Sequence, residues 1–414
     1  MQYGLIGEKL GHSYSKIIHQ MLKSKPYELK ELSQDEVEAF MRAKDFSAIN
    51  VTIPYKTAVI PYLSHVSARA QEIGAVNTVV NRGGELWGYN TDFYGLSALI
   101  LHAGIFLMDK KVAILGTGGT SKTAIAVAKY LGARTILPVS RTAGENVITY
   151  GQLRCEHADV EVVINTTPVG MYPNTEAAPI DVSAFPNLSG VIDVIYNPLC
   201  SKLVLEAQKR GIKAEGGLYM LVAQAVRASE IFLDCTYPFQ TAEIIYQELF
   251  KSTQNIVLSG MPSSGKSTVG KHLANELKRE FFDLDEEIVR VAGRSIPEIF
   301  EAEGEAYFRD LETRVLRENL ANKKGIVLAT GGGAILRDEN VDLLHRNGKI
   351  YFIDRPLEAL LPTADRPLAS SHEAVRRRFE ERYERYCTTA DCRIDGDGSV
   401  EEVAARIRKD FENL

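Results

Sequence analysis

Two short apolar runs in this chain each lead directly into a glycine-rich turn and then into a segment of helical period. The first run is residues 112–115, before Gly116, and the second is residues 256–258, before Gly260. A helix that starts directly after a buried strand offers unpaired N–H groups and the positive end of its dipole to a phosphate. The two starts lie too far apart for one small domain, and no repeat relates their surroundings. We therefore expect two separate nucleotide-binding domains.

The length of 414 residues exceeds what one hydrophobic core usually supports, and the 45% apolar and 25% charged fractions are those of a globular chain. Short apolar runs alternate with helical-period segments, which predicts an α/β fold with parallel sheets. We expect a substrate-binding α/β domain over residues 1–100 and a Rossmann-type dinucleotide domain over 101–222. Helical periodicity over 223–250, interrupted near Pro238, returns to the first domain. A phosphate-loop domain is expected over 255–414.

The net charge of -6 disfavours a nucleic-acid or membrane partner, because such proteins normally carry a basic excess or stripe. No segment has the long apolar run of a membrane span.

The five cysteines show no C-x-x-C pair, so neither a zinc site nor a disulfide framework is predicted. We expect a reducing cytoplasm. The sequence does not decide the oligomeric state, and a homodimer stays open.

The first glycine turn indicates a dinucleotide, because glycines allow the backbone to approach a pyrophosphate closely. The next strand, residues 135–139, ends without the Asp or Glu that binds the ribose hydroxyls of NAD. A cation and hydroxyls there suit the 2′-phosphate of NADP, although Arg141 could also be an ordinary surface arginine. The candidate NADP residues are Gly116, Gly118, Gly119, Thr120, Ser140 and Arg141.

Polar clusters interrupt the apolar runs of the first part of the chain, which is costly unless a partner such as a ligand meets them. The clusters are GHSYS (11–15), NVTIPYK (50–56), GAVNT (74–78) and GYNTD (88–92). Together with NTTPVGM (165–171), DVIYNP (193–198) and GLYMLVAQ (217–224), they resemble the shikimate dehydrogenase family over residues 1–250.

This resemblance implies NADPH-dependent reduction of 3-dehydroshikimate, with Lys56 and Asp92 as the catalytic pair. A lysine beside a carboxylate can protonate and stabilise the alkoxide that hydride attack creates. A purely structural salt bridge is the alternative, but it would leave the surrounding polar cluster unexplained. The resemblance assigns substrate binding to Ser13, Ser15, Thr52, Asn77, Asp92, Tyr196 and Gln224.

Three positions depart from the family pattern. Lys16 stands where proline is usual, Ser140 where the cofactor-binding asparagine is usual, and Ser201 where threonine is usual. None of them removes a catalytic group. Ser140 bears on the adenosine-phosphate contacts and so on the strength of the NADP preference.

The second glycine turn fits the phosphate-loop pattern G-x-x-x-x-G-K-S/T, with Lys266 for the transferring phosphoryl and Ser267 for magnesium. A phosphate loop alone does not separate a hydrolase, a switch protein and a small-molecule kinase. The candidate ATP residues are Gly260, Pro262, Ser263, Ser264, Gly265, Lys266, Ser267, Thr268 and Arg366.

Downstream motifs resemble shikimate kinase, of the P-loop nucleoside-monophosphate-kinase-like class, over residues 255–414. They are FFDLD (281–285), SIPEIF (295–300), GEAYFR (304–309), the glycines at 331–333 and RPL (366–368). The resemblance implies that Asp283 assists Mg²⁺, Asp285 is the base for the acceptor hydroxyl, and Arg366 stabilises the phosphoryl group from a lid. It assigns shikimate binding to Asp285, Arg309, Gly331, Gly332, Gly333 and Arg382, with Glu312 orienting Arg309.

Two other readings stay open. One half of the chain could have lost catalysis and serve as a ligand-sensing or regulatory module. Alternatively, a quinate-preferring dehydrogenase could be joined to a gluconate-type kinase. The lid segment before Arg366 is shorter than the family's and lacks its glycines, and the adenine contacts have no assignment.

Overall fold

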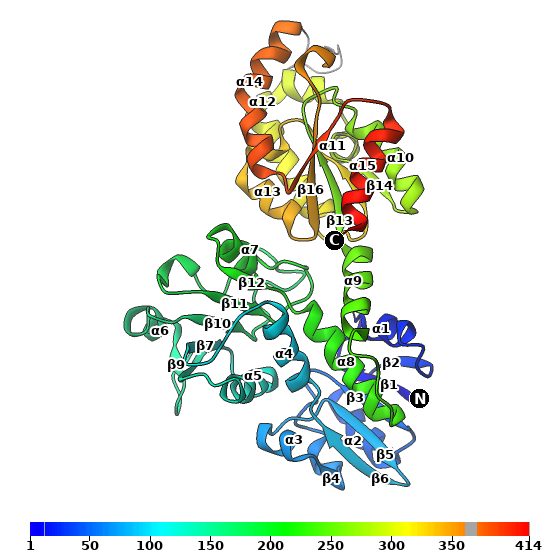
Figure 1. Cartoon of the computed structure of the whole chain (residues 1–414), viewed down its shortest axis with the longest axis vertical. Helices are drawn as coiled ribbons and strands as arrows, with labels where there is room; N and C mark the ends of the chain where they lie inside the picture. Colours follow the sequence, from blue (N-terminus) through cyan, green and yellow to red (C-terminus); the bar gives the residue numbers. More distant parts are fainter. Residues whose placement is uncertain (12, 361–370, 414) are drawn as a thin grey trace. The chain divides into compact units, whose positions relative to one another are not determined.

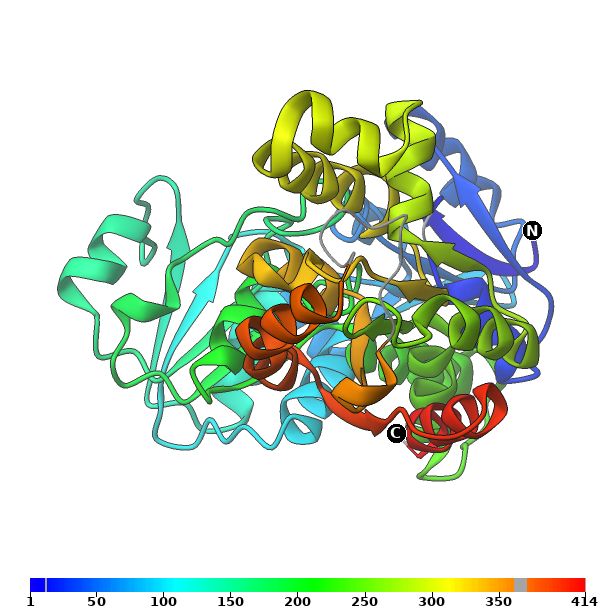
Figure 2. The same ribbon diagram turned by 90° about the horizontal axis from the view of Figure 1, so that it is seen from above.

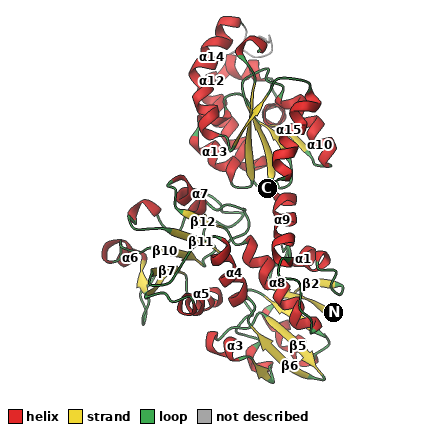
Figure 3. Ribbon diagram, in the orientation of Figure 1, coloured by secondary structure: helices red, strands yellow, loops and turns green. Residues whose placement is uncertain are grey.

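The computed structural model describes residues 1–11, 13–360 and 371–413, which form two compact units, Met1–Tyr246 and Gln247–Leu414 (Figure 1). Strands form sheets with helices packed on their faces in both units, so the predicted α/β class is confirmed (Figure 3). None of the helices within these ranges has both the length and the apolar character needed to cross a lipid bilayer.

The first sheet of unit 1 is mixed rather than parallel throughout. Its order is β2-β1-β3-β5-β6-β4, and β3, β5 and β6 pair antiparallel. Only Gly83 and Gly84 join β5 to β6, both with positive φ, so these strands form a hairpin instead of a crossover. The strands are β1 (Tyr3–Gly7), β2 (Tyr27–Glu31), β3 (Ala48–Val51), β4 (His65–Val66), β5 (Thr78–Arg82) and β6 (Glu85–Tyr89). The helices in this part are α1 (Ser15–Met21), α2 (Gln34–Ala43), α3 (Ala68–Ile73) and α4 (Asp92–His102).

The second sheet of unit 1 is parallel throughout, in the order β12-β11-β10-β7-β8-β9. The chain adds β8 and β9 on one side of β7 and then β10, β11 and β12 on the other side, so the strand order reverses between β7 and β10. Open α/β sheets bind their ligands at such a switch point. Its strands are β7 (Lys111–Leu115), β8 (Thr135–Ser140), β9 (Ile148–Thr149), β10 (Val162–Asn165), β11 (Gly190–Asp193) and β12 (Lys213–Glu215). Its helices are α5 (Gly119–Tyr130), α6 (Tyr150–Glu156) and α7 (Lys202–Lys209), with a short 3-10 turn η2 (Val182–Ala184).

Two further helices follow, α8 (Leu218–Leu233) in unit 1 and α9 (Thr241–Thr253), which contains the boundary between the two units. The break near Pro238 is where the sequence predicted it, but α8 starts earlier than predicted, directly after Gly217. α8 packs against α4 at close range (Figure 1). A Cβ atom at Gly95 of α4 would lie 2.6 Å from the carbonyl oxygen of Met220, so only glycine allows this approach.

Unit 2 is built on a parallel sheet in the order β14-β15-β13-β16-β17. Its strands are β13 (Asn255–Ser259), β14 (Phe281–Asp283), β15 (Val327–Ala329), β16 (Gly348–Asp354) and β17 (Cys392–Asp395). Its helices are α10 (Lys266–Leu277), α11 (Leu284–Ala292), α12 (Ile296–Val315), α13 (Asp338–His345), α14 (His372–Thr389) and α15 (Val400–Glu412). α12 breaks at Gly304, where φ is +82°, and its second half carries Arg309 and Glu312.

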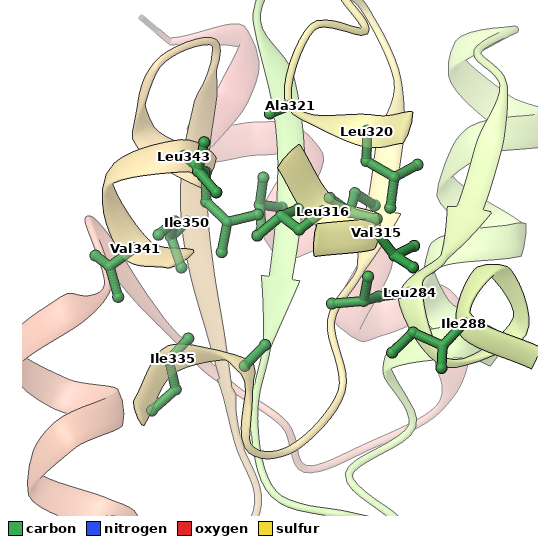
Figure 4. Packing of buried hydrophobic residues seen from close by; sticks show 14 of the residues in the cluster. Leu284, Ile288, Val315, Leu316, Leu320, Ala321, Ile335, Val341, Leu343 and Ile350 are labelled. Atoms are coloured by element: carbon green, nitrogen blue, oxygen red, sulfur yellow. The ribbon is translucent and has the colours of Figure 1, made fainter. Parts of the chain in front are cut away.

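Alternating side chains of the unit 2 strands feed two separate hydrophobic cores, one on each face of the sheet. Val257 of β13 joins the core formed with α11, α12 and α13, part of which Figure 4 shows. Its neighbours Ile256 and Leu258 join the core under α10 and α15. These two helices lie side by side (Figure 2). Burial on both faces explains why β13 is a continuous apolar run in the sequence.

Candidate active sites

A lysine and a carboxylate from separate elements of unit 1 meet in one pair. Lys56 follows β3, and Asp92 is the first residue of α4; Lys56 Nζ donates to Asp92 Oδ2 at 2.7 Å. The two side chains are only 14% and 9% exposed. The N-terminal end of α4 favours a negative charge at Asp92. The pair is therefore largely shielded from solvent, unlike a surface ion pair.

Asn77 fixes the residue that precedes Asp92. Its Oδ1 accepts a hydrogen bond from the Thr91 backbone N–H at 2.7 Å, and its Nδ2 donates to Thr91 Oγ1 at 3.0 Å. Asn50 of β3 holds Asn77 in place in turn, because its Nδ2 donates to the Asn77 carbonyl oxygen at 3.2 Å. Tyr27 in turn donates its hydroxyl to Asn50 Oδ1 at 2.7 Å. Asn77, predicted as a substrate ligand, thus also holds the start of α4.

Tyr27 was not identified from the sequence as part of a site, and Asn50 appeared there only as the first residue of the NVTIPYK cluster, without a role of its own. Their strands, β2 and β3, are not neighbours in the sheet. Tyr27 begins the largely charged strand YELKE and so carries no sequence signal, whereas Asn50 is a polar residue within the buried strand AINV.

The first glycine turn lies beside Lys56. Gly116 has φ +110° and Gly118 has no atom within 4 Å of a Cβ position, so the backbone of the turn is open to a phosphate. A Cβ atom at Gly119 would lie 3.8 Å from Lys56 Cδ. The dinucleotide turn of the second sheet and the charged pair of the first therefore form one site.

The adenosine end of this site lies at the neighbouring strand. Ser140 is the last residue of β8, which pairs with β7, and Arg141 follows it as an exposed side chain. Thr120 is in the first turn of α5, after the glycines. A hydroxyl and an exposed guanidinium at the end of β8 suit a 2′-phosphate.

The predicted substrate ligands come from four places in unit 1. Ser13 Oγ donates to Ser15 Oγ at 3.1 Å at the start of α1. The Tyr14 ring lies 5.8 Å from the ring of Tyr196, whose pKa is raised by burial. Thr91 Oγ1 donates to Gln224 Oε1 at 3.4 Å, which places the α8 glutamine beside the start of α4.

Thr52 follows β3, and its backbone N–H donates to the Ile6 carbonyl oxygen at 3.0 Å. A Cβ atom at Gly7 would lie 2.6 Å from Thr52 Cγ2, so glycine leaves room for this side chain. The structure therefore places Thr52 in the loop that leads to Lys56.

The phosphate loop of unit 2 adopts backbone conformations that favour glycine at its two motif positions. Gly260 and Gly265 have φ of +151° and +89°, and Ser263 also has a positive φ, +65°. A Cβ atom at Gly260 would lie 2.8 Å from Ser264 Oγ and 2.9 Å from the Ile353 carbonyl oxygen. Lys266 Nζ donates to the carbonyl oxygens of Gly260 and Met261, both at 2.9 Å. Pro262 lies within this loop, and Thr268 is in the first turn of α10, which follows the loop.

A hydroxyl and a carboxylate lie together at the end of the phosphate loop. Ser267 Oγ donates to Asp283 Oδ2 at 2.5 Å, and Asp283 Oδ1 accepts from the Asp285 backbone N–H at 3.0 Å. Among the described residues, no cluster of three or more His, Cys, Asp or Glu side chains could hold a metal ion. This donor set fits Mg²⁺, which is usually bound by one or two protein oxygens together with phosphates and waters.

The three glycines at 331–333 are the centre of the acceptor region. A Cβ atom at Gly331 would lie 2.6 Å from Asp285 Oδ1, and one at Gly333 would lie 2.3 to 2.4 Å from the guanidinium atoms of Arg309. The Gly332 carbonyl oxygen accepts from Arg382 Nη1 at 3.0 Å and from the Tyr386 hydroxyl. The predicted acceptor residues thus surround one turn.

Arg309 is held by a buried glutamate. Its Nη1 donates to Glu312 Oε2 at 2.7 Å, and the Glu312 side chain is 0% exposed. Burial raises the pKa of Glu312, the charge of Arg309 opposes this shift, and the charge of Asp285 adds to it. Glu312 therefore orients Arg309 as the sequence predicted.

Arg378 is a further cation that the sequence interpretation missed. It precedes Arg382 by one helical turn on α14, and burial together with the charges of Arg382 and Arg309 lowers its pKa. The four-residue spacing from Arg382 was the available signal. Arg366 and the lid segment around it lie outside the described residues.

The fold and the two sites define a chain with a dinucleotide-dependent oxidoreductase followed by a phosphate-loop kinase. A family model of the shikimate dehydrogenase substrate binding domain matches residues 5–79, and one of shikimate kinase matches residues 262–412. The shikimate dehydrogenase (NADP(+)) of Clostridium perfringens (strain SM101 / Type A) is 34% identical over 265 residues, which are 60% of this chain and 97% of that protein.

Two solved structures agree with this match. Shikimate dehydrogenase 1 from Peptoclostridium difficile has a TM-score of 0.56 and 35% identity, covering 60% of this chain and 98% of that one. A chorismate mutase/shikimate 5-dehydrogenase fusion protein from Clostridium acetobutylicum has a TM-score of 0.56 and 34% identity, covering 60% and 96%. The chain belongs to the shikimate dehydrogenase family, and a shikimate kinase domain follows the dehydrogenase in the same polypeptide.

Proposed function

We propose that this chain reduces 3-dehydroshikimate to shikimate with NADPH and then phosphorylates shikimate with ATP to shikimate 3-phosphate. The observation that carries the proposal is that its two units match families of which one makes shikimate and the other consumes it. Both units also hold charged groups arranged for those reactions.

In the reduction, NADPH supplies a hydride to the ketone carbon. Lys56 donates a proton to the ketone oxygen as its negative charge develops, so the product is the neutral hydroxyl. Asp92 keeps the ammonium in place through the 2.7 Å hydrogen bond and accepts from the substrate hydroxyl. Ser13 and Ser15 bind the carboxylate, and Thr52, Asn77, Tyr196 and Gln224 complete the polar cradle. Gly116, Gly118, Gly119 and Thr120 hold the pyrophosphate, and Ser140 and Arg141 the 2′-phosphate.

In the phosphorylation, ATP supplies the phosphoryl group. Asp285 accepts the proton of the attacking hydroxyl, while Lys266 stabilises the charge on the phosphates. Ser267 and Asp283 bind Mg²⁺, and the backbone of residues 260–268 cradles the phosphates. Arg309 and Arg382 bind the acceptor carboxylate beside the glycine turn. The role of Arg366 in the lid rests on the resemblance alone.

We further propose that the partners are small molecules, not nucleic acid, and that the enzyme works in the cytoplasm, where both NADPH and ATP are produced. A homodimer is the assembly to test first, by light scattering of the purified chain.

One coupled assay tests the proposed function. The purified chain receives 3-dehydroshikimate, NADPH and Mg-ATP, and mass spectrometry follows shikimate and shikimate 3-phosphate. We expect both, in that order. Loss of one step would favour the regulatory alternative for that unit. Faster oxidation of quinate than of shikimate, or phosphorylation of gluconate, would favour the other enzyme pair.

A further inference from the structure

A buried polar network at the ends of β10 and β11 has no role in the chemistry described so far. Asp193, Asn165 and Ser201 are 0%, 0% and 1% exposed. Asp193 Oδ1 accepts from Asn165 Nδ2 at 3.0 Å and from the Ile195 backbone N–H at 3.0 Å. Asp193 Oδ2 accepts from Ser201 Oγ at 2.6 Å. One carboxylate thus receives three hydrogen bonds inside the protein.

All three of these donors are neutral, so burial of the carboxylate is not offset by a cation among them. Burial raises the pKa of Asp193 to about 6, and the hydrogen bonds from Ser201, Ile195 and Asn165 oppose this shift. Burying a carboxylate without a counter-charge is costly. We therefore ask which parts of the structure the three hydrogen bonds hold together, since an apolar side chain could not make them.

The first element tied by the carboxylate is the loop after β10. Asn165 Oδ1 accepts from the backbone N–H and the hydroxyl of Thr167, at 3.0 and 2.7 Å, which leaves its Nδ2 to donate to Asp193. The same loop packs against the glycine turn that begins at Gly116. Thr166 Oγ1 donates to the Leu115 carbonyl oxygen at 2.6 Å, and a Cβ atom at Gly116 would lie 2.8 Å from Thr166 Oγ1.

The second element is the loop after β11, which leads directly to Tyr196. The Ile195 carbonyl oxygen accepts from the Gly217 N–H at 2.8 Å. A Cβ atom at Gly217 would lie 2.1 Å from the Val194 carbonyl oxygen, so the start of α8 packs against this loop at a distance that only glycine allows. α8 carries Gln224. The position of Asp193 therefore bears on two predicted substrate ligands.

The third element is α7. Ser201 Oγ accepts from the Val204 backbone N–H at 3.3 Å and so caps this helix while it donates to Asp193. The ends of β10 and β11 lie on the side of the switch point away from Ser140 and Arg141. In a Rossmann-type fold this is the half that receives the nicotinamide.

We propose that Asp193 is a positioning residue that couples the nicotinamide half of the dinucleotide site to the substrate ligands Tyr196 and Gln224. The proposal rests on the dehydrogenase function proposed above. Asp193 touches neither cofactor nor substrate; it sets the distance between the two loops that do. Loss of its hydrogen bonds should therefore weaken the binding of both NADP⁺ and the ketone acid.

Two substitutions separate hydrogen bonding from charge. Asn at position 193 can keep the network, because its oxygen can accept from Asn165 and Ile195 while its amide donates to Ser201 Oγ. Ala leaves all three donors without an acceptor. We expect Asp193→Ala to raise the Kd for NADP⁺ and the KM for 3-dehydroshikimate each by about tenfold or more, and Asp193→Asn to change both by less than about threefold. Titration calorimetry gives the Kd and steady-state kinetics the KM.

Asp181→Ala is the matched control. Its carboxylate is exposed and caps η2 by accepting from the Ser183 N–H at 2.8 Å, without contact with either loop. It should leave both constants unchanged. A purely structural role of Asp193 would instead lower the folded fraction and the apparent kcat of the Ala variant, with Kd and KM unchanged, and this result would overturn the proposal.

An Asp193→Asn variant as impaired as the Ala variant would also overturn it, because charge rather than hydrogen bonding would then matter. Failure of the dehydrogenase function itself gives a different result. In that case the wild-type chain does not reduce 3-dehydroshikimate, and the Kd for NADP⁺ still compares the variants.

Discussion

The two active regions use a lysine in contrasting ways. Lys56 is held by a carboxylate at 2.7 Å and belongs to the turn after β3 of the first sheet, whereas the glycine turn that it faces follows β7 of the second sheet. Lys266 is part of its glycine turn and donates to two neutral carbonyl oxygens of that turn. A carboxylate competes for the ammonium with any incoming anion, whereas neutral carbonyls release it more easily to a phosphate. The lysine that we propose as proton donor is therefore held by a carboxylate from another element, and the lysine that we propose for the phosphates is held by the backbone of its own loop.

The largest expected effect tests the first half of this comparison. Lys56→Ala should lower the kcat of ketone reduction by about 10² to 10⁴, because the developing alkoxide loses its proton donor. Substrate binding should weaken only modestly, and kinase turnover should persist. Lys30→Ala, an exposed lysine of β2, is the control. Near wild-type turnover of the Lys56 variant, followed by NADPH absorbance, would rule out Lys56 as the proton donor.

A slightly smaller effect tests the second half. Lys266→Ala should lower the kcat of phosphoryl transfer by about 10² to 10³, because one preorganised donor to the phosphates is lost. Shikimate binding and dehydrogenase turnover should survive. Lys271→Ala on the same helix removes an exposed pair with Glu286 and a cation–π contact with Phe281, both away from the phosphate loop, and serves as the control. A variant that transfers phosphate normally would mean that the lysine stays with its loop carbonyls throughout.

Arg309→Lys extends the comparison to the residue that we propose to bind the carboxylate of shikimate in the kinase unit. Arginine can form two parallel hydrogen bonds with a carboxylate while Glu312 holds it, and a lysine ammonium lacks that planar fork. We expect the kinase KM for shikimate to rise by about tenfold, with the KM for ATP unchanged. Arg314→Lys, exposed on the same helix, is the matched control. If shikimate affinity does not change, a different acceptor must be sought.

The smallest effect concerns the other end of the helix that begins at Asp92. His102 ends α4, where its Nδ1 lies 2.8 Å from Glu215 and its Nε2 lies 3.5 Å from Glu243, and its ring stacks on Tyr219 and meets Tyr246 edge-on. The hydrogen bond with Glu215, and the charges of both glutamates, raise its pKa above 6.5 against the effect of burial.

Because the folded pKa is raised, this stabilisation is fully present below pH 6.5 and is lost as the pH rises through the folded pKa. His102→Asn should therefore lower the Tm of unit 1 by about 1 to 3 °C at pH 6 and by less at pH 8.5. Scanning calorimetry with and without NADP⁺ assigns the unit 1 transition. His65→Asn is the control, because the His65 side chain is 44% exposed and its partner Glu85 is more exposed still. An equal loss at both pH values would contradict the charge-based explanation.

The sequence predicted the α/β class, which the structure confirms, and its site predictions rest on the most specific pattern where the residues are close together in the chain. The phosphate loop is such a case, because backbone, lysine and serine of one continuous segment form the whole cradle. The distances between Asp285, Arg309 and the glycines at 331–333 could be inferred only through resemblance to a family. Their roles remain predictions, although the structure does place them around one turn.

Buried polar networks were beyond the reach of sequence patterns. Asn165 and Asp193 are separated along the chain, but they are direct partners across β10 and β11. Tyr27 and Asn50 meet only because β1 separates their strands at the right register. In each case a hydrogen bond depends on strand order, and strand order is set by the packing of the whole sheet. The hairpin of β5 and β6 was not predicted, because the alternation of apolar runs and helical-period segments was taken to indicate parallel sheets, and the glycine pair between these strands was not considered.

The glycine turn at 331–333 matters for the discovery of inhibitors. A Cβ atom at Gly331 would collide with Asp285, and one at Gly333 would collide with Arg309. Any side chain introduced there would displace a group that we propose to bind the acceptor. A compound that gains its affinity from the backbone of this turn would therefore be hard to escape by point mutation, because a resistant variant would lose its own substrate together with the drug.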